Sequence, residues 1–280
     1  MRIQVADVKL FFDIEGLKLR PDGPAMRQVP TLLLLHGGPG FDHSGFKPVF
    51  TEMATVVQLV YLDLRGNGRS DAGPANKWSL EQWAEDVHSF CEALSIEDPI
   101  VMGHSLGGIV AMVYAARYPD HPSKLILSST SIQPVGERSF DMFERLGGLR
   151  ARAAAMAFWT DPNEASLAEY EEVCVPLYTR TVPLAGLLER AVRNPAMRLV
   201  FFEPELRRLD LLRQLDGIKC PTLMVAGEDD PITPVADMED IAAAMRPDLI
   251  RLVRFANAGH GVYRDQPGAF FRELRDFIAA

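Results

Sequence analysis

A serine in the stretch Gly103-His104-Ser105-Leu106-Gly107 stands between two glycines, each two positions away. The apolar residues 99–102 predict a buried strand before it, and residues 108–116 predict a helix after it. A chain that turns from strand to helix at a serine is strained, and glycines remove side chains that would collide with neighbouring backbone. The helix start directs N–H groups toward any negative charge that develops beside Ser105. The stretch is therefore either the seat of a nucleophile or an ordinary strand-to-helix turn.

A serine hydroxyl is a poor nucleophile at neutral pH and needs a histidine base that a carboxylate orients. His260 lies in a loop of small residues after the last predicted strand, and three acids, Glu228, Asp229 and Asp230, follow the strand before it. Loops at the carboxyl ends of parallel strands gather at one edge of a sheet, so His260 and an acid are expected near Ser105. Spacing alone does not choose among the acids. Solvated loop charges are the alternative for them, and a capping role is the alternative for His260.

The run His36-Gly37-Gly38-Pro39-Gly40 follows a wholly apolar strand and forms a glycine-rich loop. Such a loop lets the backbone approach a ligand closely and direct an N–H group at it, as an oxyanion hole requires. A phosphate-binding loop is the rival, but the lysine-serine pair of that motif does not follow, and the dinucleotide-binding glycine spacing is absent. A plain turn remains the alternative.

Strand and helix patterns alternate over most of the chain, which predicts an α/β fold with parallel strands and right-handed crossovers. Residues 21–30 are expected to form a Pro/Gly loop. The predicted helices cover 44–54, 80–94 behind a Ser79 cap, 106–117, 234–245 and 267–278. The predicted strands are Ile3–Val8, Leu10–Ile14, Thr31–Leu35, Val56–Leu62, 100–103, Lys124–Ser128, Thr222–Ala226 and Ile250–Phe255.

The alternation stops between about residues 135 and 215, where Ala, Leu, Arg and Glu recur at helical spacing. Five prolines are expected to divide this segment into short helices: Pro162, Pro176, Pro183, Pro195 and Pro204. We therefore predict one core domain, residues 1–134 and 216–280, with a helical cap, residues 135–215, inserted after the sixth strand. Its aromatic residues are candidates for an apolar pocket above Ser105, with packing between cap helices as the alternative: Phe158, Trp159, Tyr178, Phe201 and Phe202.

Composition narrows the class of protein further. The 280 residues are 48% hydrophobic and carry a formal net charge of −9, which argues against nucleic acid and anionic membranes as partners. The N-terminus does not resemble a secretory signal, and no apolar run is long enough to span a membrane. Cys91, Cys174 and Cys220 lack the paired spacing of metal ligands, so we expect reduced, buried thiols in a cytoplasmic protein.

Taken together, the motifs resemble the α/β-hydrolase superfamily over nearly the whole chain. Within that superfamily, two segments resemble the proline iminopeptidase branch: the loop at 36–40 and the segment 63–70, with its D-x-R-G-x-G-x-S pattern. The resemblance implies a catalytic triad of Ser105, Asp230 and His260. It also implies that the backbone N–H groups of Gly38 and Leu106 form the oxyanion hole, and that no metal or organic cofactor takes part.

Two departures bear on the substrate. The serine turn has Gly-His-Ser-Leu-Gly where iminopeptidases commonly have Gly-Gly-Ser-Trp-Gly, and this version is shared with esterases and lactonases. Iminopeptidases also bind the substrate amine with cap glutamates, and none of the candidates here can be matched to them: Glu164, Glu169, Glu171, Glu172 and Glu203. The sequence therefore predicts a serine hydrolase of small ester, amide or short peptide substrates, in its most specific form an iminopeptidase. A carboxylesterase or lactonase is the alternative, and a non-catalytic ligand binder is the remote one.

Overall fold

The computed structural model describes residues 1–132, 135–182, 185–198 and 214–280. Its centre is an eight-stranded sheet in the order β1-β2-β6-β5-β7-β8-β9-β10. The first two strands pair antiparallel with their neighbours, and all the others run parallel. The strands are β1 (Arg2–Val5), β2 (Val8–Glu15), β5 (Thr31–Leu35), β6 (Gln58–Leu62), β7 (Ile100–His104), β8 (Lys124–Ser128), β9 (Thr222–Gly227) and β10 (Ile250–Phe255). The predicted α/β fold with a mostly parallel sheet is confirmed.

Helices cover both faces of this sheet because alternate side chains of each strand point to opposite sides. In β5, Leu33 and Leu35 pack into the cluster formed with α1 (Leu80–Ala93), α2 (Leu106–Arg117) and α7 (Val235–Ala244). Leu32 and Leu34 pack into the other cluster, with α8 (Val262–Asp265) and α9 (Pro267–Ala279). The fully buried pattern of β5 follows from this double cover.

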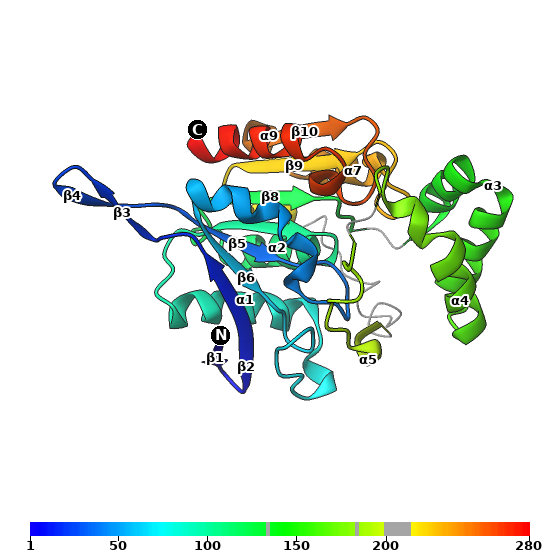
Figure 1. Ribbon diagram of the computed structural model, residues 1–280, viewed down its shortest axis with the longest axis horizontal. Coiled ribbons are helices and arrows are strands. Elements are labelled where there is room, and N and C mark those ends of the chain that lie inside the picture. Colours follow the sequence, from blue (N-terminus) through cyan, green and yellow to red (C-terminus); the bar gives the residue numbers. More distant parts are fainter. Residues whose placement is uncertain (133–134, 183–184, 199–213) are drawn as a thin grey trace.

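Two local predictions are wrong. Residues 21–30 are not simply a loop, since β3 (Leu19–Asp22) and β4 (Ala25–Gln28) form a hairpin that projects from the sheet in Figure 1. All of β4 is exposed, so the hairpin has no buried face to produce an alternating pattern. The helix expected over 44–54 is instead two 3-10 turns, His43–Phe46 and Val49–Thr55, with Pro48 between them.

The segment after β8 contains α3 (Glu137–Thr160), α4 (Glu164–Val173), a 3-10 turn (Val175–Tyr178) and the short α5 (Pro195–Arg198). Pro162 lies between α3 and α4, as expected of a proline that separates helices. Within the 24 residues of α3 there is a further break, at Gly148, where the backbone is not helical (φ 76°, ψ −173°) and which the prolines did not predict. Pro183 and Pro204 lie outside the described residues. In Figure 1, α3 and α4 lie beyond the carboxyl ends of the parallel strands.

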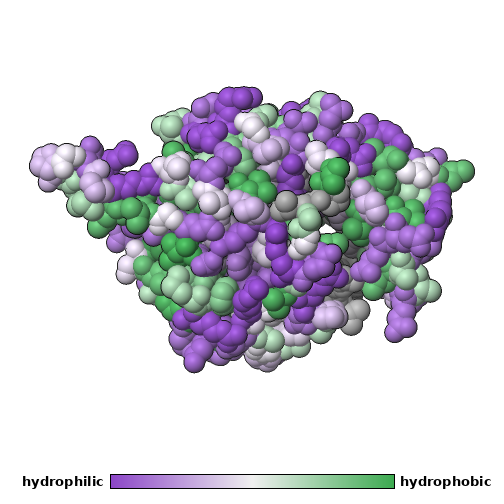
Figure 2. Space-filling model, viewed as in Figure 1, coloured by the Kyte–Doolittle hydropathy of each residue, from purple (hydrophilic) through white to green (hydrophobic). Residues whose placement is uncertain are grey.

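The surface and the cysteines complete the description of the fold. Hydrophilic residues cover much of the face shown in Figure 2, with hydrophobic residues in groups between them. Cys91, Cys174 and Cys220 are buried free thiols, as predicted. Among the described residues, no helix has both the length and the apolarity that crossing a membrane requires.

Candidate active site

Ser105 occupies the turn between β7 and α2 in a conformation that side-chain-bearing residues rarely adopt, with φ 53° and ψ −121°. Hydrogen bonds on both sides maintain it. The Ser105 N–H donates to the carbonyl oxygen of Ser128 at 3.0 Å, and the Ser105 carbonyl accepts from the Thr130 hydroxyl at 2.7 Å. Strain that the surrounding structure maintains in this way is typical of functional positions.

The two flanking glycines are required by the packing of this turn. A Cβ on Gly103 would lie 2.1 Å from the carbonyl oxygen of Gly107, and a Cβ on Gly107 would lie 2.1 Å from that of Leu35. Neither approach is sterically possible without moving backbone. The prediction that these glycines prevent collisions with neighbouring chain is confirmed.

His260 and Asp230 are brought together because each follows one of two adjacent parallel strands, β10 and β9. The His260 Nδ1 atom lies 2.9 Å from Asp230 Oδ2. The carboxylate is fully buried and also accepts from the backbone N–H groups of Ile232 and Thr233, at 2.9 and 3.0 Å, and from the Thr233 hydroxyl at 2.7 Å. Since the Asp230 carboxylate accepts the Nδ1 proton, the lone pair of the neutral imidazole is on Nε2.

The three consecutive acids differ in their surroundings. Glu228 is exposed, and Asp229 forms an ion pair with Arg145 at 2.6 Å. Only Asp230, of these three, bonds the imidazole of His260. The geometry therefore singles out the acid that spacing alone left open.

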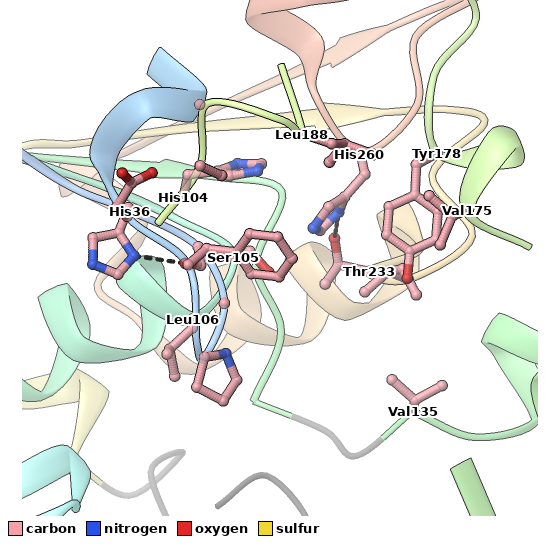
Figure 3. Close-up of a pocket in the computed structure, with 18 of the residues that line it drawn as sticks. His36, His104, Ser105, Leu106, Val135, Val175, Tyr178, Leu188, Thr233 and His260 are labelled. Atoms are coloured by element: carbon pink, nitrogen blue, oxygen red, sulfur yellow. Dashed lines mark hydrogen bonds between the residues drawn. The ribbon is translucent and has the colours of Figure 1, made fainter. Parts of the chain in front are cut away.

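A cavity of about 410 Å³ lies where the carboxyl ends of the strands face α3 and α4. Ser105 and His260 both line it, as Figure 3 shows. Phe158, Trp159 and Tyr178 line it too, where the sequence placed a substrate pocket. Phe201 and Phe202 lie outside the described residues. Most of the wall is apolar, which is usual for sites that bind small molecules.

The glycine-rich loop after β5 passes directly beside the serine. A Cβ on Gly37 would lie 3.2 Å from the Ser105 Cβ, and Gly37, Gly38 and Leu106 line the cavity. Gly38 has φ 147°. Leu106 is the first residue of α2, at the helix end whose N–H groups have no partner within the helix.

Comparison with known proteins agrees with this architecture. The family model described as the alpha/beta hydrolase fold matches residues 30–267. The chain belongs to the α/β-hydrolase family. The provisionally named carbamate hydrolase RutD of Shigella flexneri is 28% identical over 269 residues, covering 94% of this chain and 97% of that protein. The corresponding protein of Escherichia coli is equally similar.

Solved α/β-hydrolase structures superpose over the full length of the chain. A proline iminopeptidase from Mycobacterium smegmatis matches with a TM-score of 0.81 at 22% identity, over 100% of this chain and 97% of that one. An esterase from Exiguobacterium antarcticum gives 0.72 at 20%, over 100% and 99%. An enol-lactonase from Burkholderia xenovorans LB400 gives 0.69 at 23%, over 100% of both chains. At these identities the likeness establishes the fold.

The glycine-rich loop at 36–40 is held in place by hydrogen bonds from residues whose role the sequence did not reveal. The imidazole of His36 donates from Nδ1 to the Gly37 carbonyl at 2.6 Å and accepts the Leu64 N–H at Nε2, at 3.1 Å. Burial lowers the pKa of His36, which favours this neutral form. Asn67, in the D-x-R-G-x-G-x-S segment, accepts the Gly40 N–H at 2.6 Å. The segment 63–70 thus holds the loop in place through Leu64 and Asn67, two of the variable positions of the pattern.

The loop of His260 depends in turn on a buried carboxylate, Asp265, that the sequence also did not reveal. Asp265 accepts the Gly259 N–H at 2.8 Å, the Arg180 N–H at 3.1 Å and the hydroxyls of Thr179 and Thr181. Burial raises its pKa, but the hydrogen bonds from these donors outweigh burial and leave the pKa below its ordinary value. Asp265 thereby ties the His260 loop to the segment that follows the Val175–Tyr178 turn.

His104, inside the serine turn, lies beside His260 with ring centroids 4.9 Å apart. Its Nδ1 donates to the Ser128 carbonyl at 3.2 Å. Burial, followed by the positive potentials of His260 and Arg264, lowers the pKa of His104 well below its usual value. A neutral His104 is therefore expected.

Proposed function

We propose that this α/β-hydrolase cleaves small ester or amide bonds with Ser105 as nucleophile, His260 as general base and Asp230 as the orienting acid. The observation that carries the proposal is that the strained Ser105 turn and the His260–Asp230 pair border one cavity. Family membership supports hydrolysis as the class of reaction, and buried free thiols support a cytoplasmic location.

The proposed reaction proceeds by acyl transfer. The Ser105 oxygen attacks the carbonyl carbon while His260 Nε2 accepts its proton, and Asp230 stays ionised and stabilises the imidazolium. The N–H groups of Gly38 and Leu106 stabilise the tetrahedral oxyanion, each contributing roughly 3–4 kcal/mol by analogy with other oxyanion holes. His260 then protonates the leaving group, and water repeats the sequence on the acyl-enzyme. His260 transfers each proton between Ser105, the leaving group and water, so the proposed reaction requires no metal or organic cofactor.

The lining of the cavity favours small substrates with an apolar acyl group. Phe158 and Trp159, from α3, supply aromatic surface. A carbamate is attacked by the same tetrahedral chemistry as an ester or an amide, and similarity to the RutD proteins places carbamates among the bonds to test. Carboxylesterase activity on small esters is the form we infer first, with lactones as cyclic members of that class.

Residues 135–215 act in this proposal as a cap that selects the substrate, over a core domain of residues 1–134 and 216–280. Support comes from the described part of the segment, which lies at the carboxyl edge of the sheet (Figure 1) and contributes Phe158, Trp159 and Tyr178 to the cavity (Figure 3 shows Tyr178).

An aminopeptidase of the proline iminopeptidase type is the second candidate, and Glu171 favours it. This residue of α4 lines the cavity, and a buried substrate ammonium requires a carboxylate partner. Three of the other glutamates considered for binding a substrate amine do not line the described cavity: Glu164, Glu169 and Glu172. The fourth, Glu203, lies outside the described residues. Hydrolysis of proline p-nitroanilide and of its N-acetyl form distinguishes the candidates, because an aminopeptidase must prefer the free amine.

Steady-state hydrolysis of p-nitrophenyl butyrate tests the proposed function. We expect Ser105→Ala and His260→Ala each to reduce kcat by at least about a thousandfold in folded protein. Ser123→Ala is the matched control, since Ser123 is exposed and does not line the cavity. Retention of a tenth of the wild-type kcat by Ser105→Ala would refute the assignment.

A further inference from the structure

Arg264 places a positive charge in the wall of the cavity. It lies in α8, four residues after His260, and is the only Lys or Arg among the described residues that line the cavity. Its guanidinium packs over the ring of Tyr263, 4.7 Å from the centroid. A Cβ on Gly261 would lie 2.4 to 2.6 Å from Nη2, Cζ and Nε. The glycine therefore leaves the space that this guanidinium fills.

The hydrogen bonds of Arg264 involve one nitrogen and neutral partners. Nη1 donates to the Tyr263 hydroxyl at 2.7 Å and to the Gly45 carbonyl at 3.5 Å. Within the part of the chain that the structure describes, Nε and Nη2 donate to no acceptor, and no carboxylate forms an ion pair with the group. The edge of the guanidinium formed by Nε and Nη2 carries two parallel N–H groups, and this arrangement matches the two oxygens of a carboxylate.

Other arginines close to the core are neutralised. Arg65 is fully buried and donates to both oxygens of Asp86 at 2.7 Å, with Asp7 as a further partner. Arg69 pairs with Asp42, an acid that also lines the cavity, at 2.6 Å. Arg264, in contrast to these two, lines the cavity without an ion pair to any acid of the described chain.

We propose that the cavity takes substrates that carry a carboxylate, and that Arg264 binds it. The inference rests on the proposed function, and it narrows the substrate class to esters or amides with both an apolar part and an anionic end. The apolar part faces the aromatic residues of α3, and the carboxylate lies at Arg264, in the wall that Gly45 and Tyr263 also line. Two acids of the described chain line the cavity: Asp42, which pairs with Arg69, and Glu171, which comes from α4.

Binding of 4-phenylbutyrate and of its neutral amide, measured by calorimetry, tests this in wild-type protein and, to exclude hydrolysis of the amide, in Ser105→Ala. We expect wild-type protein to bind the acid at least about tenfold more tightly, which is the range for a hydrogen bond to a charged group. Arg264→Met should abolish the preference, and Arg264→Lys should retain part of it. Arg272→Met removes an equal charge from an exposed position on α9 and should leave the preference unchanged.

Equal affinities for acid and amide in wild-type protein, or no binding of the acid, would overturn the inference. So would a preference that survives in folded Arg264→Met. If that variant does not fold, Arg264→Gln and the wild-type comparison decide the question. Calorimetry with Ser105→Ala separates the two proposals, because carboxylate preference there does not depend on Ser105 being a nucleophile. A protein that hydrolyses no ester can still prefer the acid, and an active esterase can still lack the preference.

Discussion

Asp230 differs from the acids beside it in being buried, and its partners are His260 and the N–H groups of Ile232 and Thr233. We expect Asp230→Asn to lower kcat by about 10⁴, because the amide would favour the wrong imidazole tautomer. Steady-state kinetics on p-nitrophenyl butyrate measures the loss. Asp229→Asn is the matched control and should cost only a few-fold. A larger loss in the control would place the orienting acid at residue 229.

At this scale the sequence predicted the residue types better than their partners. Ser105 and His260 were predicted from the glycines on either side of the serine and from the loops that follow strands, and the structure places both at one cavity. The choice of Asp230 needed family resemblance, because its burial depends on contacts with Thr233 and His260 that spacing does not encode. Asn67 and Asp265 were missed for the same reason, since each acts through backbone groups of segments remote in sequence.

At the scale of elements, the loop that carries His260 is held by one buried carboxylate. Asp265→Asn keeps the size of the side chain but replaces one acceptor oxygen with a donor, which would face N–H or hydroxyl donors. We expect it to destabilise the protein by about 1–3 kcal/mol and to lower kcat by displacing His260. Thermal denaturation at pH 7 measures the first effect, and Asp248→Asn, at an exposed position, is the control.

The lowered pKa of Asp265 predicts that the stability of the protein depends on pH. Its folded pKa lies below the ordinary value of 3.8, so its stabilisation is complete well above pH 3.8 and is lost as the pH falls through the folded pKa. The difference in Tm between wild-type protein and Asp265→Asn should therefore shrink as the pH is lowered below about 4. A difference that stays constant down to the acid transition would show that ionisation of Asp265 is not responsible.

The strands of the main sheet and the helices packed on it were predictable from their buried faces, and the exposed hairpin was not. A buried face did not suffice for residues 43–55, where the apolar spacing predicted one helix and the chain forms two 3-10 turns. Ser79 caps α1 and the apolar spacing set its extent, as expected. The hairpin of β3 and β4 is exposed and was missed. In α3, the break at Gly148 depends on the positive φ of one residue between two helical stretches, and a prediction based on prolines does not find it.

At the scale of the whole molecule, α3 and α4 close the cavity over loops from the carboxyl edge of the sheet. Trp159→Ala should enlarge the acyl site enough to bury about two of the four additional methylenes of p-nitrophenyl octanoate. At about 0.8 kcal/mol per methylene, this raises the kcat/KM ratio of the octanoate to the butyrate about tenfold. Leu149→Ala, at a residue of the same helix that is 74% exposed, is the control. An unchanged ratio in folded Trp159→Ala would mean that Trp159 packs the cap without limiting the substrate.

The order of elements predicted the sheet and the convergence of its loops, since parallel strands bring residues 36, 105, 230 and 260 to one edge. It did not predict how residues 178–181 join that edge, where the Tyr178 carbonyl accepts the His260 N–H at 2.8 Å. Residues 178–181 therefore support the His260 loop, while residues of α3 and α4 line the cavity.

Labelling with a fluorophosphonate, followed by mass spectrometry of the modified peptide, tests the central claim most directly. The reagent reacts with a serine that a base has activated, whatever the natural substrate is. We predict one adduct, located on Ser105, that forms much more slowly in His260→Ala and not at all in Ser105→Ala. An adduct on another residue, or an unmodified Ser105 in folded wild-type protein, would contradict the assignment of Ser105 as the nucleophile.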